Sequence, residues 1–130
     1  MTKPATHLGI NHGLCGEPMT LSKGKATARL ETTPAMGVDC HGLVHGGFVF
    51  GLADHAAMLA VNDPNVVLGA AEVKFLAPVK VGETVEAIAT VSAEKGRKRI
   101  VETSARVGER EVFSGTFTTF VLDQHVLGGK

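Results

Sequence analysis

The sequence contains no tryptophan and no tyrosine, so its only aromatic side chains besides histidine are six phenylalanines. A chain this poor in aromatic residues lacks the stacking platform on which single-stranded nucleic acids bind. It also lacks a charge excess, because 13 basic residues balance 13 acidic ones. Nucleic-acid-binding domains usually carry a basic patch or stripe. We therefore expect no nucleic-acid partner.

Long apolar runs and paired cysteines are also missing. The longest apolar stretch, residues 48–61, is too short to cross a bilayer, and it contains Asp54 and His55. The N-terminal sequence lacks the hydrophobic core of a signal peptide. The two cysteines, Cys15 and Cys40, form neither a CxxC pair nor a disulfide framework. These absences predict a cytoplasmic protein without membrane contacts.

The composition that remains is that of one globular domain. The chain has 130 residues, of which 44% are hydrophobic and 20% are charged, and this length fits a single core. Residues 1–23 are polar and rich in glycine, and we interpret them as a loosely ordered lead-in. Residues 24–122 form the predicted domain, and residues 123–130 form a C-terminal tail.

Alternating apolar and polar residues predict strands on both sides of one helix. The predicted elements are a strand over residues 24–33, a helix over 48–61, and strands over 66–79, 83–94, 97–108 and 110–122. Glycines in three junctions, at 81–83, 94–97 and 107–110, are typical of hairpin turns. Since each strand has one apolar face, we expect an α+β fold in which a long antiparallel β-sheet curls around one central buried α-helix.

The predicted helix is apolar on almost every side, which is typical of a helix enclosed by protein. Asp54 lies in its middle, where the burial of a lone charge is costly. A buried carboxylate without an obvious structural partner is a candidate functional group. The helix is preceded by His45-Gly46-Gly47, whose backbone N–H groups can bind an anion or a polarised carbonyl oxygen.

Several motifs of this chain resemble those of the hotdog-fold acyl-CoA thioesterases, and most closely the phenylacetate-pathway (PaaI-type) branch. The matching segments, in chain order, are His45-Gly46-Gly47, Leu52-Ala53-Asp54, residues 73–79 (VKFLAPV), Gly82-Glu83, Gly96-Arg97 and residues 115–122 (GTFTTFVL). The resemblance covers about residues 24–122 and implies the hotdog fold.

This resemblance implies hydrolysis of small- or medium-chain acyl-CoA or aryl-acyl-CoA thioesters. Such a reaction needs an activated water or a nucleophile, and a donor that stabilises negative charge on the carbonyl oxygen. Asp54 is the candidate base or nucleophile, and the N–H of Gly46, with Gly47 beside it, is the candidate oxyanion donor. His45 orients this loop or contacts the thioester. No metal ion and no redox cofactor is implied.

The spacing of Gly46 and Asp54 has a consequence for assembly. They are eight residues apart, which is about 12 Å along a helix axis. Both groups must approach the reacting atoms to within about 3 Å. One chain cannot easily do this, whereas two facing chains can. We therefore expect a homodimer or a dimer of dimers with active sites at the subunit interface, which is how the hotdog family is built.

Two positions are expected to contact substrate at some distance from the reacting atoms. Phe75 sets the depth of the acyl pocket together with Phe48, Met58 and the N-terminal segment, which pack across the dimer. Arg97 lies in a basic turn and is a candidate contact for the phosphates of coenzyme A. The other basic residues of this turn are Lys95, Lys98 and Arg99.

The chain departs from the PaaI-type pattern at three positions. Asp39 stands seven residues before Gly46, where this branch often has Asn or Gln, and a second carboxylate near the site would raise one of the two pKa values. Met58 and Leu68 are apolar where some relatives place a hydroxyl group. The predicted catalytic pair is present, but polar groups that could assist it are fewer.

Three alternative functions therefore remain open. The first is a non-catalytic sensor that binds acyl-CoA, although the basic N-terminal helical segment of such sensors is not seen. The second is an acyl-CoA hydratase or dehydratase, whose usual Asp/His motif is not seen. The third is an inactive interaction module on the same fold. His41, His45 and His55 lack the spacing of a metal-binding motif, and Cys40 is expected to be a small buried residue.

Overall fold

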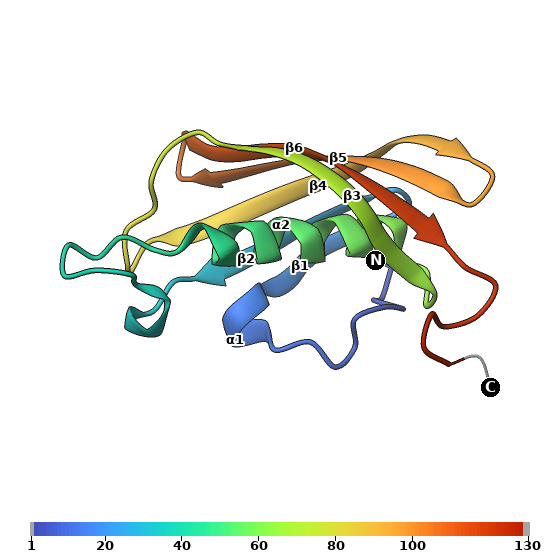
Figure 1. The fold of residues 1–130 in the computed structure, drawn as a ribbon, viewed down its shortest axis with the longest axis horizontal. Coiled ribbons are helices and arrows are strands. Elements are labelled where there is room, and N and C mark those ends of the chain that lie inside the picture. The colour runs from blue at the N-terminus through green and yellow to red at the C-terminus, as the bar shows by residue number, and fades with distance from the viewer. Residues whose placement is uncertain (1, 129–130) are drawn as a thin grey trace.

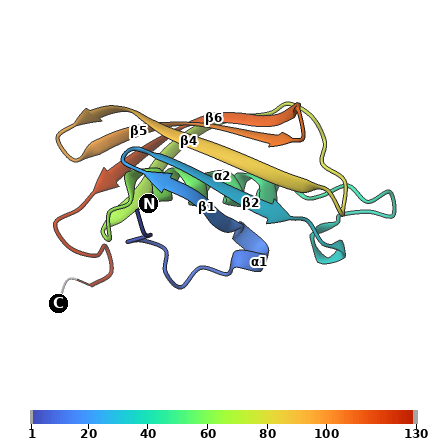
Figure 2. The ribbon, with the colours of Figure 1, turned by 180° about the vertical axis from the view of Figure 1, so that it is seen from behind.

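The computed structural model describes residues 2–128, which form one antiparallel sheet, one long helix and two short helical turns. In chain order the elements are α1 (His12–Cys15), β1 (Glu17–Ser22), β2 (Lys25–Glu31), the 3₁₀ turn η1 (Pro34–Met36), α2 (Gly46–Val61), β3 (Val66–Phe75), β4 (Thr84–Lys95), β5 (Lys98–Val107) and β6 (Arg110–Val121). The six strands follow the order β1-β2-β4-β5-β6-β3 across the sheet. The sheet curls over one side of α2, and α1 with the N-terminal segment lies on the other side (Figure 1, Figure 2). The α+β prediction of a hotdog fold is confirmed.

The central helix α2 begins and ends at residues suited to helix termini. His45 is its N-cap, and Asn62 is its C-cap, with a left-handed backbone (φ 53°, ψ 47°) that Asn tolerates. Nine residues of α2 are buried, among them Ala53, Ala56 and Ala57, whose small side chains let the sheet approach closely. Within residues 2–128, no helix is both long enough and apolar enough to cross a membrane.

Two of the three predicted hairpins are confirmed. Gly96 and Gly108 have φ angles of 59° and 60°, and each is the first central residue of a two-residue turn, the position that needs glycine in a type II′ turn. The hairpin predicted at residues 81–83 is wrong. β3 pairs with β6 at the sheet edge, whereas β4 lies between β2 and β5. Alternation along a strand defines which of its faces is buried, but it does not define which strand lies next to it.

The interpretation of residues 1–23 as a loosely ordered lead-in needs correction. Residues 17–22 form the edge strand β1, which pairs with β2. Before it, Asn11 caps the short helix α1 by accepting a hydrogen bond from the Leu14 N–H at 3.1 Å. The register of β1 shifts between Pro18 and Thr20, which interrupts the alternation that identifies a strand. Proline is tolerated in an edge strand and next to a bulge, where a missing N–H need not remove a hydrogen bond of the sheet.

Candidate active site

Asp54 lies in the middle of α2, on the part of the helix that is not fully covered. Its Oδ1 atom is buried and has no hydrogen-bond partner among the described residues. Burial raises the pKa of this carboxyl from 3.8 to about 6, because a low-dielectric environment disfavours the charged form. A group with this pKa is mostly ionised at neutral pH and is a stronger base than an exposed aspartate.

The start of α2 presents a backbone donor. The Nδ1 atom of His45 accepts a hydrogen bond from the Gly47 N–H at 2.7 Å, and the His45 N–H donates to the Met36 carbonyl at 2.9 Å. Within residues 2–128, the N–H of Gly46 has no hydrogen-bond acceptor. It therefore remains available at the positive end of the helix dipole. Of the two predicted oxyanion donors, Gly46 is free and Gly47 is engaged.

Phe75 packs directly over Gly46. A Cβ atom on Gly46 would lie 3.2 Å from the Phe75 ring, so a larger residue would displace this ring. The ring meets Phe113 in a T-shaped arrangement with the centroids 5.3 Å apart, while 55% of Phe75 remains exposed. A largely apolar cavity of about 340 Å³ adjoins these residues, with Val49 and Val79 among its walls. Phe75 thus borders a cavity at the helix start, next to the candidate donor.

Gly46 and Asp54 stand on one uninterrupted helix. Their separation of eight residues corresponds to about 12 Å along the axis. Within one chain these two groups are therefore too far apart for both to contact the same atom.

Asp39 and Arg97 engage in contacts within the chain. The Oδ1 atom of Asp39 accepts hydrogen bonds from the N–H groups of His41 and Leu43, at 2.9 and 3.2 Å, and so orders the loop before α2. The raised pKa of Asp54 is caused by burial, without a contribution from Asp39. Arg97 forms an ion pair with Asp123 at 2.6 Å in the β4–β5 turn. This turn lies at the opposite end of the sheet from the start of α2 (Figure 1).

A group of histidines next to Asp54 was not anticipated. His55 is 2% exposed, and its ring is stacked between His7 and His12, with centroid distances of 6.2 and 6.3 Å. The His55 Nδ1 atom lies 3.2 Å from the Cys15 carbonyl oxygen. Burial, and then the charge of Asp54, raise the pKa of the Cys15 thiol, which keeps it protonated. Residues 1–16 show no periodicity that could have revealed these contacts.

The histidines do not form a metal centre. Among residues 2–128, no three His, Cys, Asp or Glu side chains are grouped so that they could hold a metal ion. The expectation that Cys40 is buried is wrong, because it lies exposed in the loop before α2, where no second layer of protein covers it.

The fold and the candidate site indicate one class of proteins, and a comparison with known protein families indicates the same class. Residues 41–113 match the family model described as the thioesterase superfamily, so the chain belongs to this superfamily. The PaaI-like character is confirmed by the solved structure of a mutant of phenylacetic acid degradation protein PaaI from Thermus thermophilus. The sequence of that protein is 29% identical to this chain. The two structures align with a TM-score of 0.77 over 84% of this chain and 95% of that one. An uncharacterized protein from Pyrococcus horikoshii is 49% identical with a TM-score of 0.96, covering 97% of both chains.

Two curated relatives carry other names. A protein from Aquifex aeolicus called methylthioribose-1-phosphate isomerase is 51% identical over 126 residues, which are 96% of this chain and 28% of that protein. The transcription factor FapR of Caldanaerobacter subterraneus is 32% identical over 126 residues, which are 96% of this chain and 62% of that protein. The chain thus spans less than two thirds of the length of either relative.

Proposed function

We propose that the protein hydrolyses small- or medium-chain acyl-CoA or aryl-acyl-CoA thioesters to the free acid and coenzyme A. The observation that carries this proposal is the buried Oδ1 of Asp54, which has no hydrogen-bond partner among the described residues. An unpartnered buried carboxylate with a raised pKa is costly for stability and is typical of a catalytic base or nucleophile. Membership of the thioesterase superfamily supports thioester hydrolysis as the reaction.

In the proposed mechanism Asp54 takes a proton from a water molecule whose oxygen attacks the thioester carbon, or attacks that carbon itself to form an anhydride that water then hydrolyses. In both routes the C–S bond breaks and coenzyme A leaves as the thiol. The Gly46 N–H donates to the carbonyl oxygen and stabilises the negative charge that develops there. Its freedom from other acceptors supports this role. His45 acts on the loop, because its side chain engages Gly47 and leaves Gly46 available.

The proposed site is shared between two copies of the chain. Asp54 of one subunit and Gly46 of the other would flank one thioester, since the two groups on one helix are too far apart. The edge strand β3 supports such an assembly, because within residues 2–128 it pairs with β6 alone and it carries small exposed residues such as Ala70 and Ala71. An exposed strand edge is a template for pairing with another chain. A homodimer, or a dimer of dimers, follows from this arrangement.

Substrate contacts away from the reacting atoms are also part of the proposal. Phe75 borders the apolar cavity at the start of α2. Arg97 is a proposed contact for the phosphates of coenzyme A. Its side chain is 58% exposed and is paired with Asp123, so a phosphate would have to displace that carboxylate. Asp39 acts on the loop that precedes the helix.

A non-catalytic sensor that binds acyl-CoA is the second candidate function. It is favoured by the similarity to the transcription factor FapR, which extends over 96% of this chain. The isomerase name of the Aquifex relative supports no function for this chain, because the match covers 28% of that protein.

A panel of acyl-CoA thioesters, monitored with a thiol reagent that detects released coenzyme A, tests the proposal. Hydrolysis of one or more thioesters, lost in an Asp54→Asn variant, is the expected result. Binding of acyl-CoA by calorimetry without release of the thiol would indicate the sensor instead. If acyl-CoA is neither bound nor hydrolysed, the result would indicate an inactive interaction module. If a double bond is hydrated without release of the thiol, the result would indicate a hydratase.

A further inference from the structure

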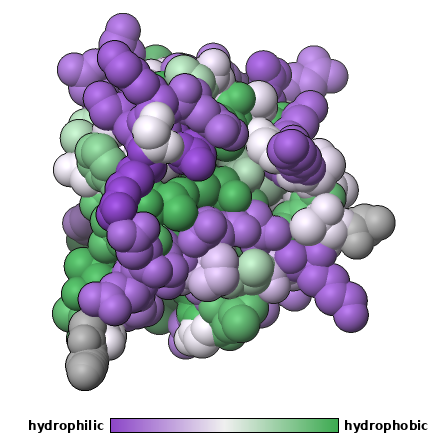
Figure 3. Space-filling view, turned by 90° about the vertical axis from the view of Figure 1, so that its right-hand side faces the viewer, coloured by the Kyte–Doolittle hydropathy of each residue, from purple (hydrophilic) through white to green (hydrophobic). Residues whose placement is uncertain are grey.

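A second cavity lies at the other end of α2, between three segments that are far apart in the sequence. It has a volume of about 600 Å³, which is within the usual range for small-molecule sites. Its walls come from residues 5–10, from residues 64–67 at the start of β3, and from His125 and Val126 in the C-terminal tail. At this end of the molecule hydrophobic surface is exposed between polar side chains (Figure 3). We call this space the terminal cavity.

The N-terminal wall of the terminal cavity is held in place on α2. The Asn62 side chain accepts a hydrogen bond from the Ala5 N–H at 2.7 Å and donates one to the Lys3 carbonyl at 3.0 Å. Thr6 is 5% exposed, and its hydroxyl lies 2.8 Å from the Nδ1 atom of His7. The His7 ring is stacked on His55. These contacts give the cavity a preformed wall.

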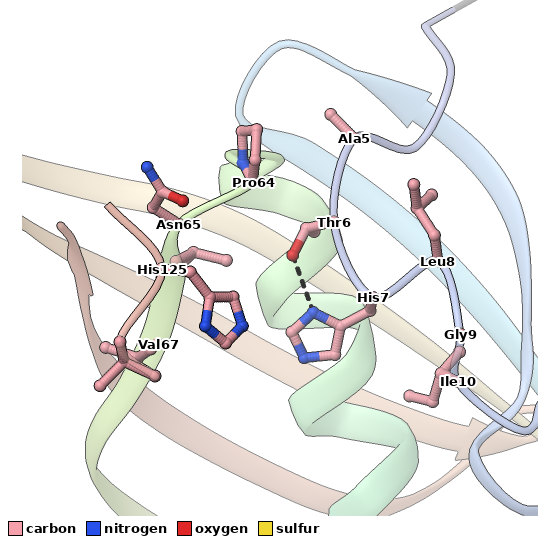
Figure 4. Close-up of a pocket in the computed structure, with 12 residues that line it drawn as sticks. Ala5, Thr6, His7, Leu8, Gly9, Ile10, Pro64, Asn65, Val67 and His125 are labelled. Atoms are coloured by element: carbon pink, nitrogen blue, oxygen red, sulfur yellow. Dashed lines mark hydrogen bonds between the residues drawn. The ribbon is translucent and has the colours of Figure 1, made fainter. Parts of the chain in front are cut away.

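Two imidazole rings face each other across the terminal cavity (Figure 4). The Nδ1 atom of His125 accepts a hydrogen bond from the Leu127 N–H at 3.0 Å. The proton of the neutral His125 ring is therefore on Nε2, which becomes a donor. In the described part of the chain, neither the Nε2 of His125 nor that of His7 has a hydrogen-bond partner. The other walls are largely aliphatic, with Ile10 and Val67 among them.

The terminal cavity lies beyond Asp54, toward the C-terminal end of α2. His7, which lines it, is stacked on the residue that follows Asp54. Asn62, which holds the N-terminal wall, is eight residues beyond Asp54, or about 12 Å along the axis. A fully extended acyl group of about ten carbons has this length.

We propose that the terminal cavity binds the acyl end of the substrate, and that its two histidines form hydrogen bonds with an oxygen atom at the far end of that group. The inference rests on the proposed thioesterase function and adds a substrate class to it: acyl groups with a hydroxyl, keto or carboxyl oxygen at the distal end. The aliphatic walls accommodate the carbon chain. The Nε2–H of His125 and the free Nε2 of His7 favour a chain with a terminal oxygen over a plain one, since their hydrogen bonds with water would otherwise be lost on desolvation.

Direct binding tests this proposal without any turnover. The probes are hexanamide and 6-hydroxyhexanamide, observed through the imidazole nitrogen resonances of the protein labelled with ¹⁵N-histidine. We expect both probes to shift the His7 and His125 signals, with His41 unchanged as an internal reference. One additional hydrogen bond should make the hydroxylated probe bind roughly three- to tenfold more tightly. Absence of any shift at His7 and His125 at millimolar probe would overturn the proposal.

Filling the cavity provides the matching variants. Val67→Trp and, at the mouth, Leu8→Trp place an indole in this space. Ile88→Trp on β4, where the residue is 38% exposed and does not line the cavity, is the control. Both cavity variants should weaken probe binding by about tenfold or more, and the control should not. Leu8 is 75% exposed, so its variant is expected to fold even where Val67→Trp does not.

The result separates the two proposals. If the amides bind at His7 and His125 but no thioester is hydrolysed, the cavity assignment stands and the hydrolytic function fails. If thioesters are hydrolysed but the cavity variants leave the preference between acetyl-CoA and 10-hydroxydecanoyl-CoA unchanged, the cavity assignment fails. The expected result is a selective loss of kcat/KM for the longer substrate, by about tenfold or more.

Discussion

The Nδ1 atom of His45 accepts a hydrogen bond from the Gly47 N–H at 2.7 Å, and this contact determines which backbone N–H is free at the start of α2. An N-cap normally satisfies an N–H of the first helical turn. Here the cap engages the second residue of the helix and leaves the N–H of the first residue, Gly46, without an acceptor in the described chain. The geometry thus leaves one backbone donor free and engages its neighbour.

Replacement of Asp54 by Asn should abolish turnover while the protein still folds. Loss of a general base costs about 10²–10⁴-fold in rate, or roughly 3–5 kcal/mol of transition-state stabilisation. Steady-state kinetics on the best thioester measure the loss, with circular dichroism and size-exclusion chromatography as controls for folding and assembly. Retention of more than about a tenth of wild-type activity would show that Asp54 is not the catalytic group.

The same substitution should stabilise the protein at neutral pH. Because the pKa of Asp54 is raised from 3.8 to about 6, the folded state binds its proton more tightly than the unfolded state. The folded state is therefore destabilised by ionisation of the Asp54 carboxyl as the pH rises from 3.8 through about 6. The Asn variant avoids this loss of stability. Two pKa units correspond to about 3 kcal/mol of unfolding free energy at pH 7.

Urea denaturation measures this effect. Asp54→Asn should be clearly more stable than the wild type at neutral pH, and the difference should shrink toward pH 4. Asp123→Asn, which alters an exposed carboxylate, is the control and should change little at either pH. Equal stability of Asp54→Asn and the wild type at neutral pH would contradict a buried, unpartnered carboxylate.

Replacement of Gly46 by Pro removes the proposed oxyanion donor. Proline is tolerated in the first helical turn, so the fold should persist. We expect kcat to fall by about 10²-fold or more. Gly46→Ala is the matched control, because it adds the Cβ atom that meets Phe75 at 3.2 Å but keeps the N–H. If both variants lose activity equally, the cause is displacement of Phe75 and the donor lies elsewhere.

Mixing the inactive Asp54→Asn and Gly46→Pro proteins should restore activity after subunit exchange. In a mixed dimer one site combines an intact Gly46 with an intact Asp54, and the other site collects both lesions. Random mixing gives up to about a quarter of wild-type activity, since half of the dimers are mixed and each has one working site. Exchange confirmed by mass spectrometry with no return of activity would refute the shared site.

Acidification should destabilise the protein through His55, which lies on α2, and His7, which is stacked on His55. Burial lowers the pKa of His7, and burial followed by the charges of His7 and His12 lowers that of His55, although contacts with Cys15 and Gly16 partly oppose this. Their contribution to stability is therefore present above the ordinary pKa of 6.5 and is lost as the pH falls below it. Below this pH, His7 and His55 bind protons more readily in the unfolded chain than in the folded chain.

Thermal unfolding at neutral and mildly acidic pH checks this prediction. A His7→Gln variant should show a smaller drop in Tm on acidification than the wild type. His41→Gln, in the exposed loop before α2, should behave like the wild type. An unchanged drop in the His7 variant would show that His7 does not contribute to the acid sensitivity.

Much of this protein can be predicted from local sequence patterns. The apolar run of α2 predicts a buried helix, and the alternation of β4, β5 and β6 predicts strands with one buried face. Asp54 stands out because a single carboxylate interrupts the apolar run. Each of these signals depends on neighbouring residues along the chain, where hydrophobic burial imposes a period of 3.6 or 2 residues.

Other features depend on contacts between distant segments, and no local pattern reports them. β3 pairs with β6 although β4 and β5 lie between them in the sequence, and β1 joins the sheet although a bulge at Pro18 breaks its alternation. The free N–H of Gly46 depends on the orientation of the His45 side chain. The histidines around His55 meet because residues 3–16 fold back along α2. Periodicity records which side of an element is buried, whereas tertiary packing determines what lies against it and which polar groups are left without a partner.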